Sequence, residues 1–336
     1  MNPRNKLACV ILLFTFAYSL YVFNGSIDDF AAFHTVPMNE IIQSAYIPNE
    51  CVVQVPGFHV LGAIISEVSG ISARNLIFLP VELIPYMFLF FLVIYRFSSD
   101  YIIASLVTAL DMISVTTGSF RVFFWPHGIG AILLYSLFLI LYSIINEDRV
   151  RVSRKSEFIC LFLICGSSLI FISYDYFAYL IFLLMSLFFI FSISIIFTQY
   201  KEKKLKFFNI CRKIIGLGSI FIILEFGLST FFYDSFVVSL KNSQHLNVSF
   251  LDKFIVAYLH MNESSPGIRQ MLVHYPSIIS YISSIKYVCL TISILIFIFL
   301  IFYKWRESNI FNIYDIFTLA IIFMNFFYGL IRLYIG

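Results

Sequence analysis

Residues 26–34 read SIDDFAAFH and place two adjacent carboxylates, Asp28 and Asp29, directly after an apolar run at 7–23. Carboxylates can activate a hydroxyl group as a general base, or hold Mg²⁺ or Mn²⁺ through their oxygen atoms. Charged side chains that border a hydrophobic segment are costly in lipid and therefore indicate a functional site. We predict that Asp28 and Asp29 are the catalytic residues and metal ligands, and which of the two is the base stays open.

Further ionisable side chains border the other hydrophobic segments of the chain. A guanidinium group pairs with a phosphate through charge-assisted hydrogen bonds, so arginines at these places suit a phosphate-bearing substrate. The predicted substrate-binding residues are His34, His59, Arg121, His127, Asp175, Arg269 and Arg332. Asp175, in the stretch SYDYF, is also a candidate metal ligand.

These candidates have simpler alternative interpretations. The aspartates can be solvated loop residues, the histidines can be structural, and Asp175 can be a helix cap. Arg332 can extend to the lipid headgroups from a span. A zinc site is disfavoured because the histidines lack the HxxxH type of spacing. The gathering of these residues on one side of the predicted topology favours a polar cavity that opens outward.

The composition indicates what positions these residues. The chain has 336 residues, of which 60% are hydrophobic and 12% are charged, and its mean hydropathy is +0.93. A soluble domain cannot bury so much apolar surface, which predicts an all-α polytopic membrane protein with one transmembrane domain over 1–336. About 20 apolar residues are needed to cross a bilayer. Runs that meet or approach this length predict nine spans, at 7–23, 75–96, 101–118, 127–146, 157–173, 177–198, 213–232, 284–303 and 313–334.

The basic residues predict the orientation of these spans. A cytoplasmic N-terminus places 15 of the 22 Lys and Arg residues inside, including the clusters RVRVSRK and KEKKLK, and the other 7 outside. The net charge of +3 then reflects topology and does not indicate nucleic-acid binding. Two long segments, 24–74 and 233–283, are expected on the extracytoplasmic side.

Two short amphipathic helices are predicted in the first outer segment. The stretch 37–46 has apolar residues at helical spacing, with Pro37 in its first turn. The stretch 58–70 has an apolar stripe, and the opposite stripe carries His59 and Glu67. Both are too short to span, so we expect them at the membrane–water interface, with the polar stripe near the outer surface.

Four pieces of the sequence resemble a known family: DDFAAFH (28–34), VPGFHVLGAIISEVSGI (55–71), FFWPHGIGAILL (123–134) and SYDYFAYLIF (173–182). Their order, over about the first 200 residues, is similar to that of the GT-C glycosyltransferases. These are integral membrane enzymes that include the protein O-mannosyltransferases and the oligosaccharyltransferases.

The resemblance implies transfer of a sugar from a polyprenyl-phosphate-linked donor to a glycan, lipid or protein acceptor on the outer face. An acidic residue of the first outer loop serves as base or metal ligand in the family, a role that falls on Asp28 or Asp29. Arg121, Arg269 or Arg332 would neutralise the departing lipid phosphate. The chain departs from the family in its smaller number of predicted spans, in the lack of a visible soluble C-terminal domain, and in having only Asp175 as a candidate second acidic motif.

Two other functions stay open. A transporter or flippase for a lipid-linked or small polar solute would place charges near the bilayer midplane and break spans at matching positions of two halves. Only Asp111 lies near the middle of a predicted span. The other alternative is a non-catalytic membrane subunit.

Overall fold

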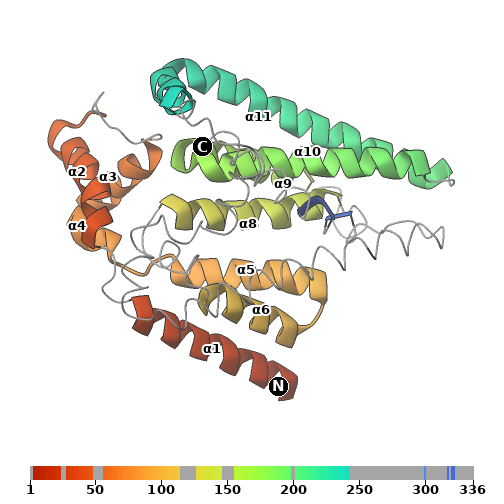
Figure 1. Cartoon of the computed structure of the whole chain (residues 1–336), viewed down its shortest axis with the longest axis horizontal. Helices are drawn as coiled ribbons and strands as arrows, with labels where there is room; N and C mark the ends of the chain where they lie inside the picture. The colour runs from red at the N-terminus through yellow and green to blue at the C-terminus, as the bar shows by residue number, and fades with distance from the viewer. Residues whose placement is uncertain are drawn as a thin grey trace. The chain divides into compact units, whose positions relative to one another are not determined.

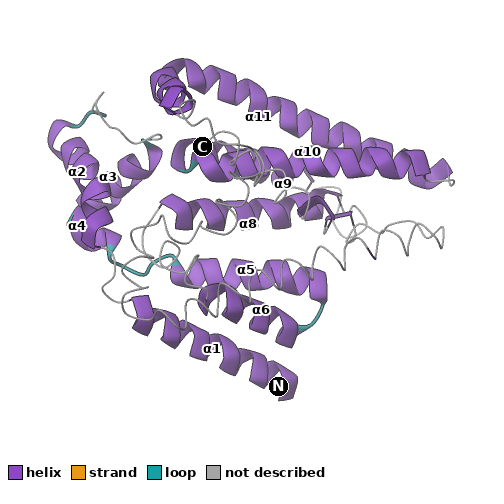
Figure 2. Cartoon of the chain, viewed as in Figure 1, coloured by secondary structure: helices purple, strands orange, loops and turns teal. Residues whose placement is uncertain are grey.

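The structure is a computed structural model that describes residues 3–23, 28–47, 56–113, 126–145, 155–197, 201–242, 299, 316–317 and 319–321. All regular elements in these ranges are helices, and no strand occurs there (Figures 1 and 2). The helices are α1 Pro3–Phe23, α2 Asp28–Ser44, α3 Gly57–Ser69, α4 Ala73–Ile77, α5 Leu83–Ser98, α6 Tyr101–Ile113, α8 Pro126–Ile145, α9 Lys155–Ile172, α10 Tyr174–Phe197 and α11 Lys201–Asn242.

The prediction of a helical membrane protein is confirmed. By length and composition, three helical stretches among the described residues can cross a bilayer: Gly128–Ile145, Tyr179–Ile196 and Lys204–Leu224. The first two agree with the predicted spans 127–146 and 177–198, and the third overlaps the predicted span 213–232. The number of nine spans stays a prediction, because 284–303 and 313–334 lie almost wholly outside the described residues.

Two of the predicted spans differ in the structure. The run 75–96 is divided into α4 and α5 by the turn at 78–82. Pro80 lies in this turn, where its missing N–H and its ring oppose a continuous helix. The run 101–118 is helical as α6 up to Ile113, and the residues after it lie outside the described part.

The chain packs as two compact units. The first comprises Met1–Leu141, Ile164–Phe177 and Asn262–Ile279, and the second comprises Tyr142–Leu163, Ala178–Met261 and Ser280–Gly336. α8, α9 and α10 each contribute to both units.

In the first unit, α1 and α5 pack on α6, and α2 packs on α3 and α4. Helices α2, α3 and α4 lie together in the red-to-orange part of Figure 1. Side chains from α2, α3, α4, α5, α6 and α8 share one buried core, composed of Met38, Phe58, Ala73, Leu76, Ile77, Leu83, Tyr86, Met112 and Ala131. A common core thus joins the short helices α2, α3 and α4 to α5, α6 and α8.

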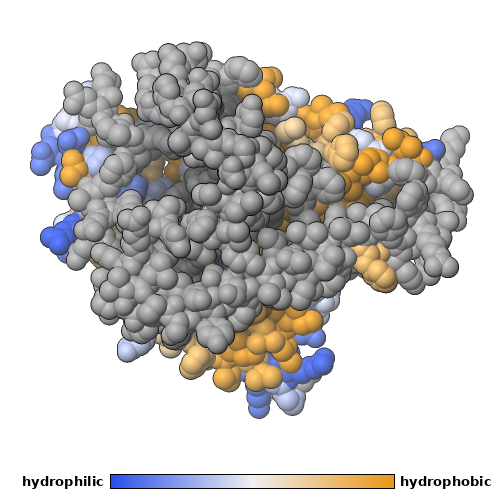
Figure 3. Space-filling model, viewed as in Figure 1, coloured by the Kyte–Doolittle hydropathy of each residue, from blue (hydrophilic) through white to orange (hydrophobic). Residues whose placement is uncertain are grey.

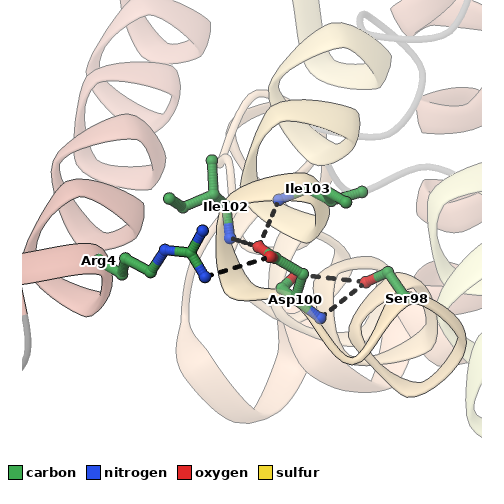
Figure 4. A network of polar contacts seen from close by, with 5 residues as sticks. All are labelled: Arg4, Ser98, Asp100, Ile102 and Ile103. Carbon is green, nitrogen blue, oxygen red and sulfur yellow. Dashed lines mark hydrogen bonds and ion pairs between the residues drawn. The ribbon is translucent and has the colours of Figure 1, made fainter.

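Asp100 fixes the start of α6 beside α1 (Figure 4). Its Oδ1 accepts hydrogen bonds from the backbone N–H groups of Ile102 at 2.8 Å and Ile103 at 3.2 Å, which is the pattern of an N-cap. The guanidinium of Arg4 lies 4.0 Å from the same carboxylate. This ion pair is mostly exposed, so the cap stabilises the helix start more than the ion pair does.

In the second unit, aromatic rings join the helices. The rings of Phe191 in α10 and Phe207 in α11 are 5.6 Å apart, and those of Phe162 in α9 and Phe221 in α11 are 5.7 Å apart. Tilted ring pairs at this separation are favourable. They hold one face of α11 against its neighbours.

Candidate functional site

The helix that carries Asp28, Asp29 and His34 begins earlier than expected. α2 begins at Asp28 and contains Pro37 in its interior, so the prediction that Pro37 opens this helix is wrong. An interior proline removes one backbone hydrogen bond and strains the preceding turn. Here Pro37 and its neighbour Met38 are both buried, and this packing offsets the loss.

His34 and His59 form a buried pair between α2 and α3. Their ring atoms Nδ1 and Nε2 are 2.9 Å apart, and the two rings are stacked with their centroids 5.1 Å apart. The side chains are 6% and 0% exposed, and Phe58 packs edge-on against both rings. One imidazole must donate the hydrogen bond and the other must accept it, so at least one of the rings is neutral.

The buried side of α3 is formed mainly by its small and polar residues. Its buried residues are Phe58, His59, Gly62, Ala63 and Ser66, which belong mainly to the small and polar stripe. The apolar stripe is exposed at Ile64 (55%) and Val68 (85%), whereas Leu61 and Ile65 of the same stripe pack against the core. Small residues between helices allow close packing, and apolar side chains on the outside are typical of helices that contact lipid. On the predicted polar stripe, His59 is thus buried and Glu67 is exposed, and the expectation that this stripe lies near the outer surface of the membrane stays a prediction.

Two glycines, Gly57 and Gly130, allow close approaches between helices that carry the other resembling pieces. A Cβ atom on Gly57 would collide with the backbone oxygen of Phe171, two residues before the SYDYF stretch. A Cβ atom on Gly130 would lie 2.6 Å from the ring of Tyr176 and 2.9 Å from Cβ of Ser173. Both distances are too short for real contacts, so only glycine permits these approaches. The start of α3 and the first turns of α8 thus lie against the junction of α9 and α10.

Four predicted site residues lie in the first turns of helices. Asp28 and Asp29 are the first two residues of α2, and His127 and Asp175 are the second residues of α8 and α10. The N-terminal end of a helix carries partial positive charge, which stabilises carboxylates there. Asp175 therefore lies at a helix start, close to the helix-cap alternative considered for it. The side chains of these four residues lie outside the described part of the structure.

The predicted arginines Arg121, Arg269 and Arg332 all lie outside the described residues. Among the side chains that the structure describes, no group of three or more histidine, cysteine, aspartate or glutamate residues could hold a metal ion. The predicted ligands Asp28, Asp29 and Asp175 are not among those side chains. Their carboxylate oxygens are the ligand type that Mg²⁺ and Mn²⁺ prefer.

A polar contact joins the first turn of α5 to α6, in agreement with the interpretation that an acid such as Asp111 within an apolar run more often pairs with another helix than reacts. The Tyr86 hydroxyl donates a hydrogen bond of 2.5 Å to Oδ2 of Asp111. The hydroxyl of Tyr135 lies 3.4 Å from the Tyr86 hydroxyl. Asp111, the charge nearest the middle of a predicted span, therefore joins α6 to α5. Glu82, the residue before α5, is also buried, with 3% of its surface exposed. Both residues are acids within apolar runs of the sequence, and this pattern is the signal that marks them.

The comparisons with known proteins give no family for this chain: no family model, no curated protein and no solved structure matches it.

Proposed function

We propose that this chain is a membrane glycosyltransferase of the GT-C type. It transfers a sugar from a polyprenyl-phosphate-linked donor to a glycan, lipid or protein acceptor on the extracytoplasmic face. The proposal includes nine spans and a cytoplasmic N-terminus. The helical, apolar character of the chain supports a membrane location, and contact with lipid follows from it.

One observation carries the proposal. The pieces DDFAAFH, VPGFH, WPHG and SYDYF are far apart in the sequence, yet contacts within the first unit bring residues of these pieces, or within two residues of them, close together. His34 joins the first piece to the second, and Gly57 of the second approaches Phe171, two residues before the fourth. Gly130, two residues after WPHG, approaches Ser173 and Tyr176 of the fourth. Such convergence is what a single site built from these pieces requires.

The proposed roles follow from residue chemistry. Asp28 or Asp29 takes a proton from the acceptor hydroxyl, or positions a divalent cation together with Asp175. Arg121, Arg269 or Arg332 pairs with the phosphate that departs with the lipid. A bound Mg²⁺ or Mn²⁺ would supply positive charge beside that phosphate. His34 and His59, which bond to each other in the interior, position α2 on α3 and do not contact substrate directly in this proposal.

The transporter alternative receives no support from a described feature. A transporter would place charges near the bilayer midplane, where the sequence offers only Asp111, and Tyr86 hydrogen-bonds this carboxyl group. A sugar-transfer assay distinguishes the proposed enzyme from a non-catalytic membrane subunit.

The test is transfer of a radiolabelled sugar from a synthetic polyprenyl-phosphate donor by the purified full chain in lipid vesicles. The radiolabel should be lost from the donor lipid and recovered on an acceptor that is extracted from the cell membranes from which the chain is purified and added to the vesicles. Removal of divalent cations with EDTA should abolish transfer, and Mg²⁺ or Mn²⁺ should restore it. Equal transfer with EDTA would remove the metal from the proposal, and no transfer under any condition would favour the non-catalytic role.

A further inference from the structure

The beginning of α11 has one face buried and the opposite face exposed. Phe207, Ile210, Cys211, Ile214 and Leu217 are buried, and they recur at the helical spacing of three and four residues. Cys211 Sγ lies 3.9 Å from Oγ of Ser192 in α10, so this face is the one that packs within the second unit.

The exposed face alternates basic and large apolar side chains. Leu205, Phe208 and Ile215 are 63%, 59% and 52% exposed, and Lys204 and Arg212 are also exposed. Lys204, Phe208, Arg212 and Ile215 follow one another at intervals of four, four and three residues, which places them along one side of the helix. Figure 3 shows hydrophobic side chains over the part of the surface where α10 and α11 lie, with hydrophilic ones among them.

This face lies on a helical stretch, Lys204–Leu224, that is apolar enough to cross a bilayer. Apolar side chains exposed on such a stretch face lipid, and a cation among them is costly unless it reaches the headgroup level. Helical side chains lean toward the N-terminal end of their helix. Arg212 therefore leans back toward Lys204, away from the apolar residues that follow, so both cations are suited to the same headgroup layer.

Lys204 and Arg212 have no polar partner among the residues that the structure describes. Neither forms an ion pair or hydrogen bond among the described residues, whereas Lys206 and Lys213 on the same helix do interact with other groups. The described side chains of α11, at 204–224, include no acidic residue. Among the described side chains, the charge on this face thus has no anionic partner.

We propose that Lys204 and Arg212 form a binding surface for the headgroups of anionic phospholipids, with Leu205, Phe208 and Ile215 in contact with the acyl chains. The partner is a lipid of the leaflet in which the α11 N-terminal end lies. This surface is independent of the proposed glycosyl transfer, and it requires only that α11 spans the membrane.

The test uses the full chain in mixed micelles of phosphatidylcholine with an increasing fraction of phosphatidylglycerol. Binding of a lipid to the folded state raises the thermal midpoint of unfolding, and the dependence on lipid fraction gives an apparent affinity. The double substitution Lys204→Gln/Arg212→Gln should weaken this affinity by about 30-fold, the combined effect of two cations near an anionic surface. The charge-preserving Lys204→Arg/Arg212→Lys variant should retain it.

The matched control is Lys206→Gln/Lys213→Gln, which removes the same charge from the same helix but from other faces. We expect this variant to keep the response to phosphatidylglycerol, even if its midpoint is lower without the lipid. Equal loss in both glutamine variants would overturn the surface in favour of unspecific attraction. An unchanged response of Lys204→Gln/Arg212→Gln would overturn it too, as would an equal stabilisation of the wild type by inorganic phosphate in pure phosphatidylcholine.

Discussion

Two imidazoles, His34 and His59, hold the helix that begins with Asp28 and Asp29 against its neighbour. Their hydrogen bond is almost fully buried and has Phe58 beside both rings. A buried polar group that loses its partner pays the cost of desolvation without compensation, so such a pair fixes one arrangement of the two helices. In the proposed enzyme, this bond sets where the first turn of α2 lies.

The substitution His59→Ala should therefore lower the stability of the folded chain by about 1–3 kcal/mol, because the buried His34 nitrogen loses its partner. His59→Gln should recover part of the loss, since its amide can replace one ring nitrogen. Denaturant unfolding of the protein in detergent measures both effects. Glu67→Ala, at an exposed position of the same helix, is the control and should change little. If His59→Ala and Glu67→Ala have the same free energy of unfolding, the histidine pair does not hold the two helices together.

The Tyr86–Asp111 hydrogen bond leads to a second prediction. Tyr86→Phe removes the donor and leaves the Asp111 carboxyl group without it, which should cost about 1.5–3 kcal/mol of unfolding free energy. Tyr135→Phe is a close control, because its hydroxyl lies 3.4 Å from that of Tyr86 and contributes a weaker contact. A larger effect of Tyr135→Phe than of Tyr86→Phe would contradict the assignment of Asp111 to helix packing.

The helices of the first unit depend on close approaches that only small residues allow. Gly57 brings the start of α3 against the backbone of Phe171, and Gly130 brings α8 against Ser173 and Tyr176. Backbone atoms cannot move aside as a flexible side chain can. At Gly62, by contrast, the nearest atoms belong to the end of the Met38 side chain, which can adjust. The position of the α9–α10 junction, and thus of Asp175, therefore rests on Gly57 and Gly130.

Gly57→Ala should accordingly destabilise the chain by about 1–3 kcal/mol and reduce any transfer activity, since overpacking displaces α3 from the junction. Gly216→Ala is the matched control: it lies in α11 with no atom within 4 Å of the added Cβ, and alanine favours a helix by up to about 1 kcal/mol over glycine. Thermal unfolding of the two variants in parallel tests this contrast. Equal midpoints would show that α3 does not rely on the approach to Phe171.

At the scale of the whole molecule, the sequence predicts the helical membrane class and several helix ranges well. The bounds predicted for α3, α8 and α10 are close to those observed. Long apolar runs mark α8 and α10, and Gly70, which adopts a φ of 69° in the structure, marks the end of α3. The site is less predictable. Periodicity finds a stripe on α3 but does not say which stripe is buried, and no spacing rule relates His34 to His59. The break at 78–82 falls at Pro80 within an apolar run that is long enough to be read as one span, and Pro37 lies inside α2 although a proline is more typical of a first helical turn.

The proposed topology makes a further prediction for the whole chain. In a variant whose six cysteines are replaced, a single cysteine at Ser44 should react with a membrane-impermeant maleimide from outside intact cells. A cysteine at Lys204 should react only after the membrane is opened, because the basic start of α11 is expected on the cytoplasmic side. Labelling of both positions from the same side would contradict the orientation on which the outward-facing site depends.

The most direct measurement of the central claim is sugar transfer by the variant Asp28→Asn/Asp29→Asn. With a polyprenyl-phosphate-linked donor, the rate should fall by at least about 100-fold, the contribution of a general base, while folding and membrane insertion are kept. Glu40→Gln, at an exposed position of the same helix, is the control and should transfer at the wild-type rate. Transfer by the double variant at the wild-type rate would contradict the assignment of this pair as the chemical centre.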